Sequence, residues 1–94
     1  MREKEVEAHL VKRVKKLGGE AEKFTSPGRR SVPDRLVTLP GGRVCFVECK
    51  ATGESPTDAQ ARDHERRRKR GFVVFVVDSK EAVDALPLGP TVAA

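Results

Sequence analysis

Two β-type runs separated by a helical segment constrain the fold of this chain more than any other feature. Residues 43–50 (RVCFVECK) and residues 72–77 (FVVFVV) are rich in β-branched and aromatic side chains. Between them, residues 55–70 carry helix signals and end at Gly71. Two strands joined through a helix favour parallel pairing with a right-handed crossover. The sequence therefore predicts an α/β fold.

The other segments extend this unit into a complete order of elements. Apolar residues recur at helical spacing over residues 3–17 and predict a first helix: Val6, Leu10, Val14 and Leu17. Short strands are expected at residues 20–24 and 35–39, and Pro40-Gly41-Gly42 is a hairpin turn signal. Residues 79–86 predict a closing helix capped by Ser79. The expected fold is a mixed four-stranded sheet flanked by helices, in the order α-β-β-β-α-β-α.

Two further expectations concern burial and capping. Residues 43–50 are apolar on both faces, which is typical of an interior strand, and residues 72–77 read as a buried strand. For the helix at 55–70, we expect Ser55 to cap, Pro56 to occupy the first helical position and Asp58 to complete a capping box. The body of this helix is mainly basic.

The chain is short, which limits it to one domain. Its 94 residues suggest a single domain at residues 1–88 and a flexible tail at residues 89–94. The longest uninterrupted apolar run, residues 72–77, is far below the ~20 residues of a membrane helix. The N-terminus also lacks the apolar stretch of a signal peptide. We therefore expect no membrane association and a cytoplasmic location.

The charge balance is basic. Nineteen Lys and Arg against fourteen Asp and Glu give a net charge of +5, which favours a nucleic-acid partner over ordinary solubility charge. Four Phe and no Trp or Tyr favour contacts to phosphates rather than stacking on bases. The candidate DNA-binding residues are arginines of the loop at 25–33 and of the basic helix: Arg29, Arg30, Arg66, Arg67, Arg68 and Arg70. The alternative for each is a solvated charged face.

The two cysteines do not indicate a disulfide or a zinc site. On one strand, Cys45 and Cys49 would lie about 13 Å apart, whereas a disulfide needs Cα atoms within about 7 Å. His9 and His64 are the only histidines, and no CxxC or HxxxH spacing occurs.

Acidic and basic residues meet at the ends of the predicted hairpin. Pro33-Asp34 precedes the strand at 35–39, and Glu48-Cys49-Lys50 ends the strand at 43–50. Because the hairpin pairs these strands, we expect Asp34 and Glu48 to converge. Two carboxylates with backbone oxygens suit Mg²⁺, and the Cys49 carbonyl is a candidate third ligand. Glu48 and Lys50 share a face because strand side chains alternate.

These residues match a known signature. Pro33-Asp34 with Glu48-Cys49-Lys50 fits the PD-(D/E)xK nuclease motif. The wider pattern comprises Glu7, residues 28–34 (GRRSVPD), residues 46–51 (FVECKA), Ser55-Pro56, Gln60 and His64. The sequence resembles the virus-type replication-repair nuclease (VRR-NUC) domain in its minimal, standalone form, over residues 3–80.

The resemblance implies a Mg²⁺-dependent endonuclease, with Mn²⁺ as a substitute, that acts on branched DNA such as four-way junctions or flaps as a homodimer. In that interpretation, Asp34 and Glu48 hold the metal with help from the Cys49 carbonyl, and Lys50 positions the attacking water or stabilises developing charge. Gln60 orients the lysine or a phosphate, and His64 lines the same face.

Glu7 is the acid of the first helix that would reach back to the metal. Its spacing alone instead favours a first-turn acid that complements the helix dipole.

Two alternative functions stay open at this point. One is a non-catalytic basic DNA-binding module in a larger replication or repair assembly, although intact acids and lysine favour an enzyme. The other is a nuclease without structural selectivity, one that acts on RNA, or a restriction-type enzyme. The chain has no evident target-recognition domain, which disfavours sequence-specific cutting.

Overall fold

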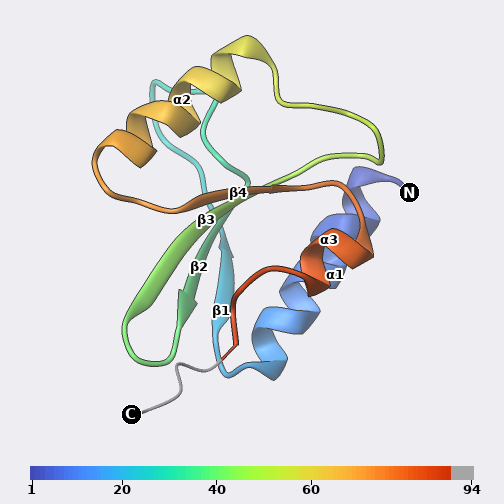
Figure 1. Cartoon of the computed structure of the whole chain (residues 1–94). Coiled ribbons are helices and arrows are strands. Elements are labelled where there is room, and N and C mark those ends of the chain that lie inside the picture. The colour runs from blue at the N-terminus through green and yellow to red at the C-terminus, as the bar shows by residue number, and fades with distance from the viewer. Residues whose placement is uncertain (90–94) are drawn as a thin grey trace.

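A computed structural model describes residues 1–89 of the chain (Figure 1). The elements follow the predicted order: α1 (Glu3–Lys16), β1 (Glu20–Lys23), β2 (Arg35–Leu39), β3 (Arg43–Cys49), α2 (Asp58–Lys69), β4 (Val74–Val77) and α3 (Lys80–Asp84). The tail expected at residues 89–94 lies, apart from Gly89, outside the described residues. Across residues 1–89, no helix is both long and apolar enough to cross a membrane.

The described strands form one mixed sheet in the order β1-β2-β3-β4. β1, β2 and β3 pair antiparallel, and β3 pairs parallel with β4 across the α2 crossover. Pro40, Gly41 and Gly42 form the three-residue loop between β2 and β3, and Gly41 and Gly42 have φ angles of 85° and 74°, which glycine adopts without a steric penalty. The mixed sheet and the interior position of β3 are confirmed.

The apolar core lies between the sheet and one layer of helices. α1 and α3 lie side by side on one face of the sheet, and α2 lies on the opposite side of the sheet (Figure 1). Fully buried side chains fill the α1–α3 side: Val6, Leu10, Val14, Val37, Val47, Cys49, Val77, Val83 and Leu88. The helical spacing over residues 3–17 thus predicted the buried stripe of α1.

The predicted capping of α2 is wrong. The helix begins at Asp58, and Thr57 rather than Ser55 is the N-cap. The Thr57 side chain accepts a hydrogen bond from the Gln60 backbone N–H, and the Gln60 side chain accepts one from the Thr57 N–H. This reciprocal capping box satisfies two N–H groups at the start of the helix, so the helix begins after Thr57.

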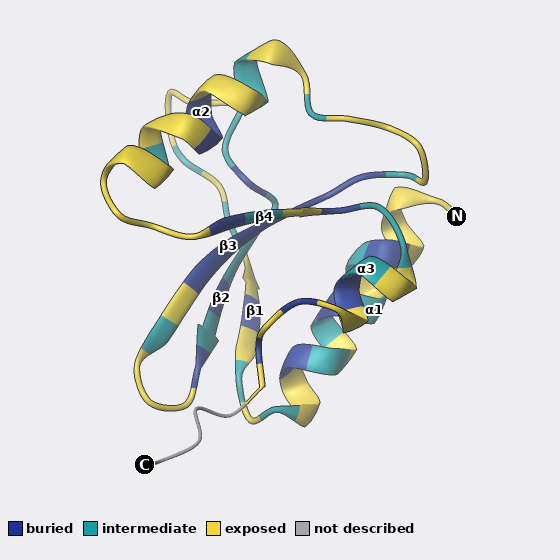
Figure 2. Ribbon diagram, in the orientation of Figure 1, coloured by how far each residue is buried: buried dark blue, intermediate teal, exposed yellow. Residues whose placement is uncertain are grey.

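The expectation of a fully buried strand at residues 72–77 is also wrong. β4 begins at Val74, while Phe72 and Val73 are each 47% exposed and Val76 is 37% exposed. β4 is the edge strand of the sheet, and within it only Val76 is exposed (Figure 2). Val44 on β3 is exposed as well. The sequence pattern predicted the presence of β4 but not how much of it is buried.

α2 packs on the sheet through a charged side chain. The Arg67 guanidinium carbon lies 5.1 Å from the Phe24 ring centroid and 4.8 Å from that of Phe46. Its Nε donates a hydrogen bond to Asp63 Oδ2 at 2.8 Å. A planar guanidinium suits both contacts, because it stacks on aromatic rings while donating in its plane.

We expect Arg67→Ala to destabilise the fold by about 2–4 kcal/mol, because it removes the aromatic contacts and a main partner of the buried Asp63. Arg62→Ala, which removes the same charge from an exposed position of α2, is the matched control and should change the free energy of unfolding by less than about 0.5 kcal/mol. Urea unfolding of both variants measures the difference. Equal stabilities would contradict the packing role of Arg67.

Candidate active site

The register of the β2–β3 hairpin brings two carboxylates together. Arg35 pairs with Val47, so Asp34 and Glu48 lie next to each other at the end of the ladder. The Cys49 backbone N–H donates a hydrogen bond to Asp34 Oδ2 at 2.7 Å. Because the N–H and C=O of a strand residue point toward the same neighbour, the Cys49 carbonyl lies on the Asp34 side of β3. The three oxygen donors proposed from the sequence therefore lie close to one another.

Glu48 is a buried acid. It is 1% exposed, whereas Asp34 is half-buried. Burial, a hydrogen bond with Asp34 and the negative charge of Asp34 raise the pKa of Glu48 to about 8, although the Lys50 charge acts in the opposite direction. Burial beside a second carboxylate disfavours ionisation, so Glu48 holds its proton at neutral pH in the absence of a metal.

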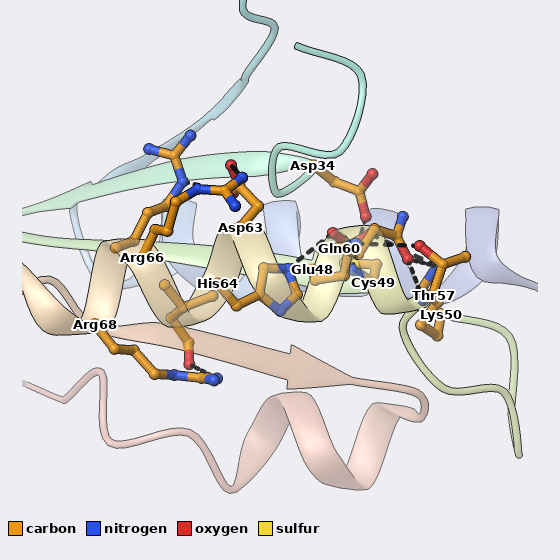
Figure 3. A network of polar contacts seen from close by, with 12 residues as sticks. Asp34, Glu48, Cys49, Lys50, Thr57, Gln60, Asp63, His64, Arg66 and Arg68 are labelled. Carbon is orange, nitrogen blue, oxygen red and sulfur yellow. Dashed lines mark hydrogen bonds and ion pairs between the residues drawn. The ribbon is translucent and has the colours of Figure 1, made fainter.

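Lys50 and Gln60 join the strand end to the start of α2. Lys50 Nζ donates a hydrogen bond to Gln60 Oε1 at 2.7 Å and lies 4.0 Å from Glu48 Oε2. Gln60 Oε1 also accepts from the Thr57 N–H at 2.9 Å. The capping box of α2 therefore fixes the side chain that holds the lysine (Figure 3).

His64 contacts the other oxygen of the buried acid. Its Nε2 lies 3.3 Å from Glu48 Oε1, and the residue is 1% exposed. Burial and the positive charge of Arg68 lower the pKa of His64. A neutral imidazole next to Glu48 acts as a hydrogen-bonding partner rather than as a counterion.

Glu3 and Glu7, two of the three acids of α1, occupy different places. Glu7 Oε2 accepts a hydrogen bond from Arg35 Nε at 2.7 Å, and Arg35 also donates to the Ala21 carbonyl. The charge of Glu7 acts on the Cys49 thiol, whereas the α1 charge that acts on Glu48 is that of Glu3. A role for Glu7 at the metal stays a prediction, and Glu3 is an acid that the sequence analysis overlooked.

The donor set fits a hard divalent cation. Among residues 1–89, no cluster of three or more His, Cys, Asp and Glu side chains is arranged to hold a metal ion. Asp34 and Glu48 supply two carboxylates, and a cation beside them would relieve the repulsion that helps to raise the pKa of Glu48. A carbonyl and water would complete such a shell, as Mg²⁺ prefers.

The candidate DNA-binding arginines differ in their surroundings. Arg67 is 12% exposed and belongs to the packing of α2. Arg68 donates a hydrogen bond to the Val74 carbonyl. Arg29 and Arg66 keep about half of their side-chain surface, and each lies near Asp63. Arg30 and Arg70 are exposed.

A basic hollow adjoins the acids. Its volume is about 360 Å³, and its lining includes Lys23, Arg29, Arg30 and Asp34. Three cations and one acid make it complementary to a polyanion, and it runs from the candidate metal ligand to the arginine loop. The loop at 25–33 is therefore more than a connector, because it forms the wall of a cavity beside the carboxylates.

The sequence analysis missed Asp63. It is 2% exposed and lies near three arginines. Helical spacing from Gln60 was the available signal, because positions 60, 63, 64 and 67 share one face of a helix. A helix with almost no apolar residues must pack a polar face against the sheet, and in α2 that face contains Asp63.

Two comparisons with known proteins match this chain. A protein of Acyrthosiphon pisum secondary endosymbiont phage 1, named "Putative nuclease p44", is 55% identical over 87 residues, which cover 93% of this chain and 94% of that protein. A solved structure described as "VRR_NUC domain" superposes with a TM-score of 0.83 and 44% sequence identity, over 87% of this chain and 89% of that one. No family model matches the sequence.

The raised pKa of Glu48 predicts how stability depends on pH without metal. Between pH 4.5 and 8 the folded state retains a proton that the unfolded state releases, so the free energy of unfolding falls as pH rises. Glu48→Gln removes this titration. In EDTA, we expect it to melt several degrees above the wild type at pH 8 and to lose that advantage toward pH 4.5.

The matched control for this measurement is Glu65→Gln, an exposed glutamate of α2, which should follow the wild-type profile. Thermal unfolding at a series of pH values provides the comparison. Parallel profiles for the wild type and Glu48→Gln would contradict the held proton.

Proposed function

The chain belongs to the VRR-NUC family, and from this we propose that it is a metal-dependent endonuclease that hydrolyses DNA phosphodiester bonds. The observation that carries the proposal is the Asp34–Glu48 carboxylate pair with Lys50 Nζ 4.0 Å from Glu48. A buried glutamate next to a second carboxylate has little structural benefit, because placing like charges side by side away from water is costly unless a cation joins them. A basic hollow next to the pair supports a nucleic-acid substrate.

The residues divide the chemistry among them. Asp34 and Glu48, with the Cys49 carbonyl, would hold Mg²⁺ or Mn²⁺. The cation would supply charge for the scissile phosphate and acidify a bound water. Lys50 stabilises negative charge that develops on the phosphate, or orients the attacking water. Gln60 fixes the lysine ammonium by accepting its hydrogen bond. Glu7 is the remaining candidate acid of the site.

Branched DNA is the substrate that we propose, and the protein would act on it as a homodimer. A two-fold dimer presents two identical sites, which suits the paired strands of a four-way junction. Exposed apolar side chains along the sheet edge support a self-associating surface: Val44, Phe72, Val73 and Val76. Residues 1–88 would form the single functional domain, and a host cytoplasm would be its place of action.

A non-catalytic DNA-binding module is the second candidate. The basic hollow and the net charge of +5 would serve such a module equally well. The Lys50–Gln60–Thr57 chain of hydrogen bonds favours the enzyme, because it orients an ammonium beside buried acids rather than toward solvent.

We expect Asp34→Asn and Glu48→Gln each to lower the cleavage rate by at least 100-fold while DNA binding stays within about threefold of wild type. Loss of a metal ligand removes several kcal/mol of transition-state stabilisation, whereas the arginines supply affinity. Cleavage of a labelled four-way junction in Mg²⁺ measures the rate, and EDTA should abolish it. A variant that keeps more than a tenth of the rate would refute the assignment.

The preference for branched DNA is tested by comparing cleavage rates on several DNA structures. We expect four-way junctions and flaps to be cut faster than nicked, single-stranded or linear duplex DNA, in Mg²⁺ and in Mn²⁺. Equal rates on all substrates would remove the structural selectivity and leave the nuclease. Binding without cleavage of any DNA or RNA in either metal would favour the non-catalytic module.

The dimer is checked by mass. Light scattering at micromolar concentration should give twice the chain mass of 10.3 kDa. Phe72→Ser should shift the mass toward the monomer, and Ala8→Ser, which changes an exposed apolar residue of α1 away from the β4 edge, is the control. A wild-type monomer would contradict the homodimer.

A further inference from the structure

We propose that Asp63 is a positioning residue that joins Arg29 and Arg66 into one clamp for a backbone phosphate of the bound DNA. This proposal rests on the proposed function for its ligand, a nucleic-acid phosphate. It goes further by assigning a role to Asp63, a buried carboxylate that is neither a proposed metal ligand nor a partner of Lys50. The clamp is made of two elements that are far apart in sequence, the loop at 25–33 and α2.

One oxygen of Asp63 serves both exposed arginines. Asp63 Oδ1 lies 3.7 Å from Arg29 Nη1 and 3.6 Å from Arg66 Nη2. The other oxygen, Oδ2, accepts the hydrogen bond from Arg67 Nε at 2.8 Å. Arg67 thereby fixes the rotation of the carboxylate, and the carboxylate fixes the separation of the other two guanidinium groups.

Asp63 differs from Arg29 and Arg66 in both charge and exposure. Asp63 is 2% exposed, so it contributes nothing to the outer surface. The Arg29 and Arg66 side chains are 54% and 47% exposed, so about half of each is open to solvent. One carboxylate neutralises one of three guanidinium charges, and Arg67 is covered by Phe24 and Phe46. The excess positive charge therefore lies on the two exposed arginines.

The clamp lies beside the candidate active site. His64, the residue after Asp63, contacts Glu48, and Gln60, one turn earlier, contacts Lys50. Figure 3 shows Asp63 and Arg66 toward one end of α2 and Asp34, Glu48 and Lys50 toward the other. Arg29 also lines the basic hollow that begins at Asp34. A strand whose phosphate lies at Asp34 can thus continue along this hollow to the clamp.

Two guanidinium groups held around one point form a better phosphate site than two mobile ones. Each arginine fork can donate two hydrogen bonds to phosphate oxygens. Free arginine side chains lose rotamer entropy when they are fixed, and a carboxylate that orders them beforehand reduces that loss on binding. The carboxylate thus increases affinity for a polyanion although its own charge repels one.

This gives a test in which the sign of the effect is decisive. Asp63→Asn and Asp58→Asn each remove one negative charge from α2, and Asp58 is exposed with no ion pair among the described residues. Simple electrostatics predicts tighter DNA binding for both variants. The clamp predicts that Asp58→Asn binds as tightly as the wild type or tighter, whereas Asp63→Asn binds about 3- to 10-fold more weakly.

Binding is measured by fluorescence anisotropy of a labelled four-way junction in Ca²⁺, which supports no cleavage, at a series of salt concentrations. Loss of one phosphate contact should reduce the slope of log affinity against log salt by about 0.9. Thermal melting of each variant shows whether it is folded. Because Asp63 is buried, Arg29→Gln and Arg66→Gln provide a second route, with Arg62→Gln as the charge-matched control on α2.

For these surface variants the clamp predicts coupling. Arg29→Gln and Arg66→Gln should each weaken binding more than Arg62→Gln, and the double variant should lose less affinity than the sum of the single losses. Tighter binding by a folded Asp63→Asn would overturn the proposal. Losses equal to that of Arg62→Gln would overturn it as well, because the arginines would then act only as diffuse charge.

These binding experiments can refute the phosphate clamp without refuting the nuclease assignment, and the reverse is also true. Cleavage by a wild type whose Asp63 and Arg29 variants bind like their controls would refute the clamp and leave the enzyme. The predicted binding losses in a protein that cuts no nucleic acid would support the clamp and refute the enzyme.

Discussion

The register of β3 is the constraint on which the rest of the molecule depends. β3 pairs antiparallel with β2 and parallel with β4, so both of its edges are fixed. A shift of one residue would exchange its faces, moving Glu48 into the apolar core and Val47 toward α2. The correct register instead places Glu48 under α2 and beside Asp34. Because side chains alternate, Cys49 faces the core while its carbonyl stays beside the acids.

The second layer of the fold is unusual in that polar groups hold it. α2 turns Asp63 and His64 inward and stacks Arg67 on two phenylalanine rings. Packing of this kind contributes less stability than an apolar helix face would, since each buried charge must recover its lost hydration from a partner. In return, the inward face of one helix supplies a hydrogen-bonding partner for Lys50, one for Glu48 and a carboxylate for the arginines. The helix thus orients the site while it closes the sheet.

The charged residues near α2 form two groups, one with excess negative charge and one with excess positive charge. Without metal, Glu48 keeps its proton at neutral pH, and its ionisation beside Asp34 destabilises the fold as pH rises. Arg29, Arg66 and Asp63 have the opposite imbalance, with excess positive charge near solvent. A cation at the first group and a phosphate at the second would each remove an electrostatic cost.

The sequence by itself determined the order of elements, the mixed sheet and the meeting of Asp34 with Glu48, because periodicity, a hairpin turn and a crossover leave few other arrangements. It did not determine what depends on neighbours distant in sequence. The start of α2 was set by the Thr57–Gln60 capping box, and the exposure of Phe72 followed from the incomplete cover of the sheet. Asp63 had no motif to mark it. Only the tertiary structure could bring Arg29 to it, because a contact between a loop and a helix depends on how the helix rotates over the sheet.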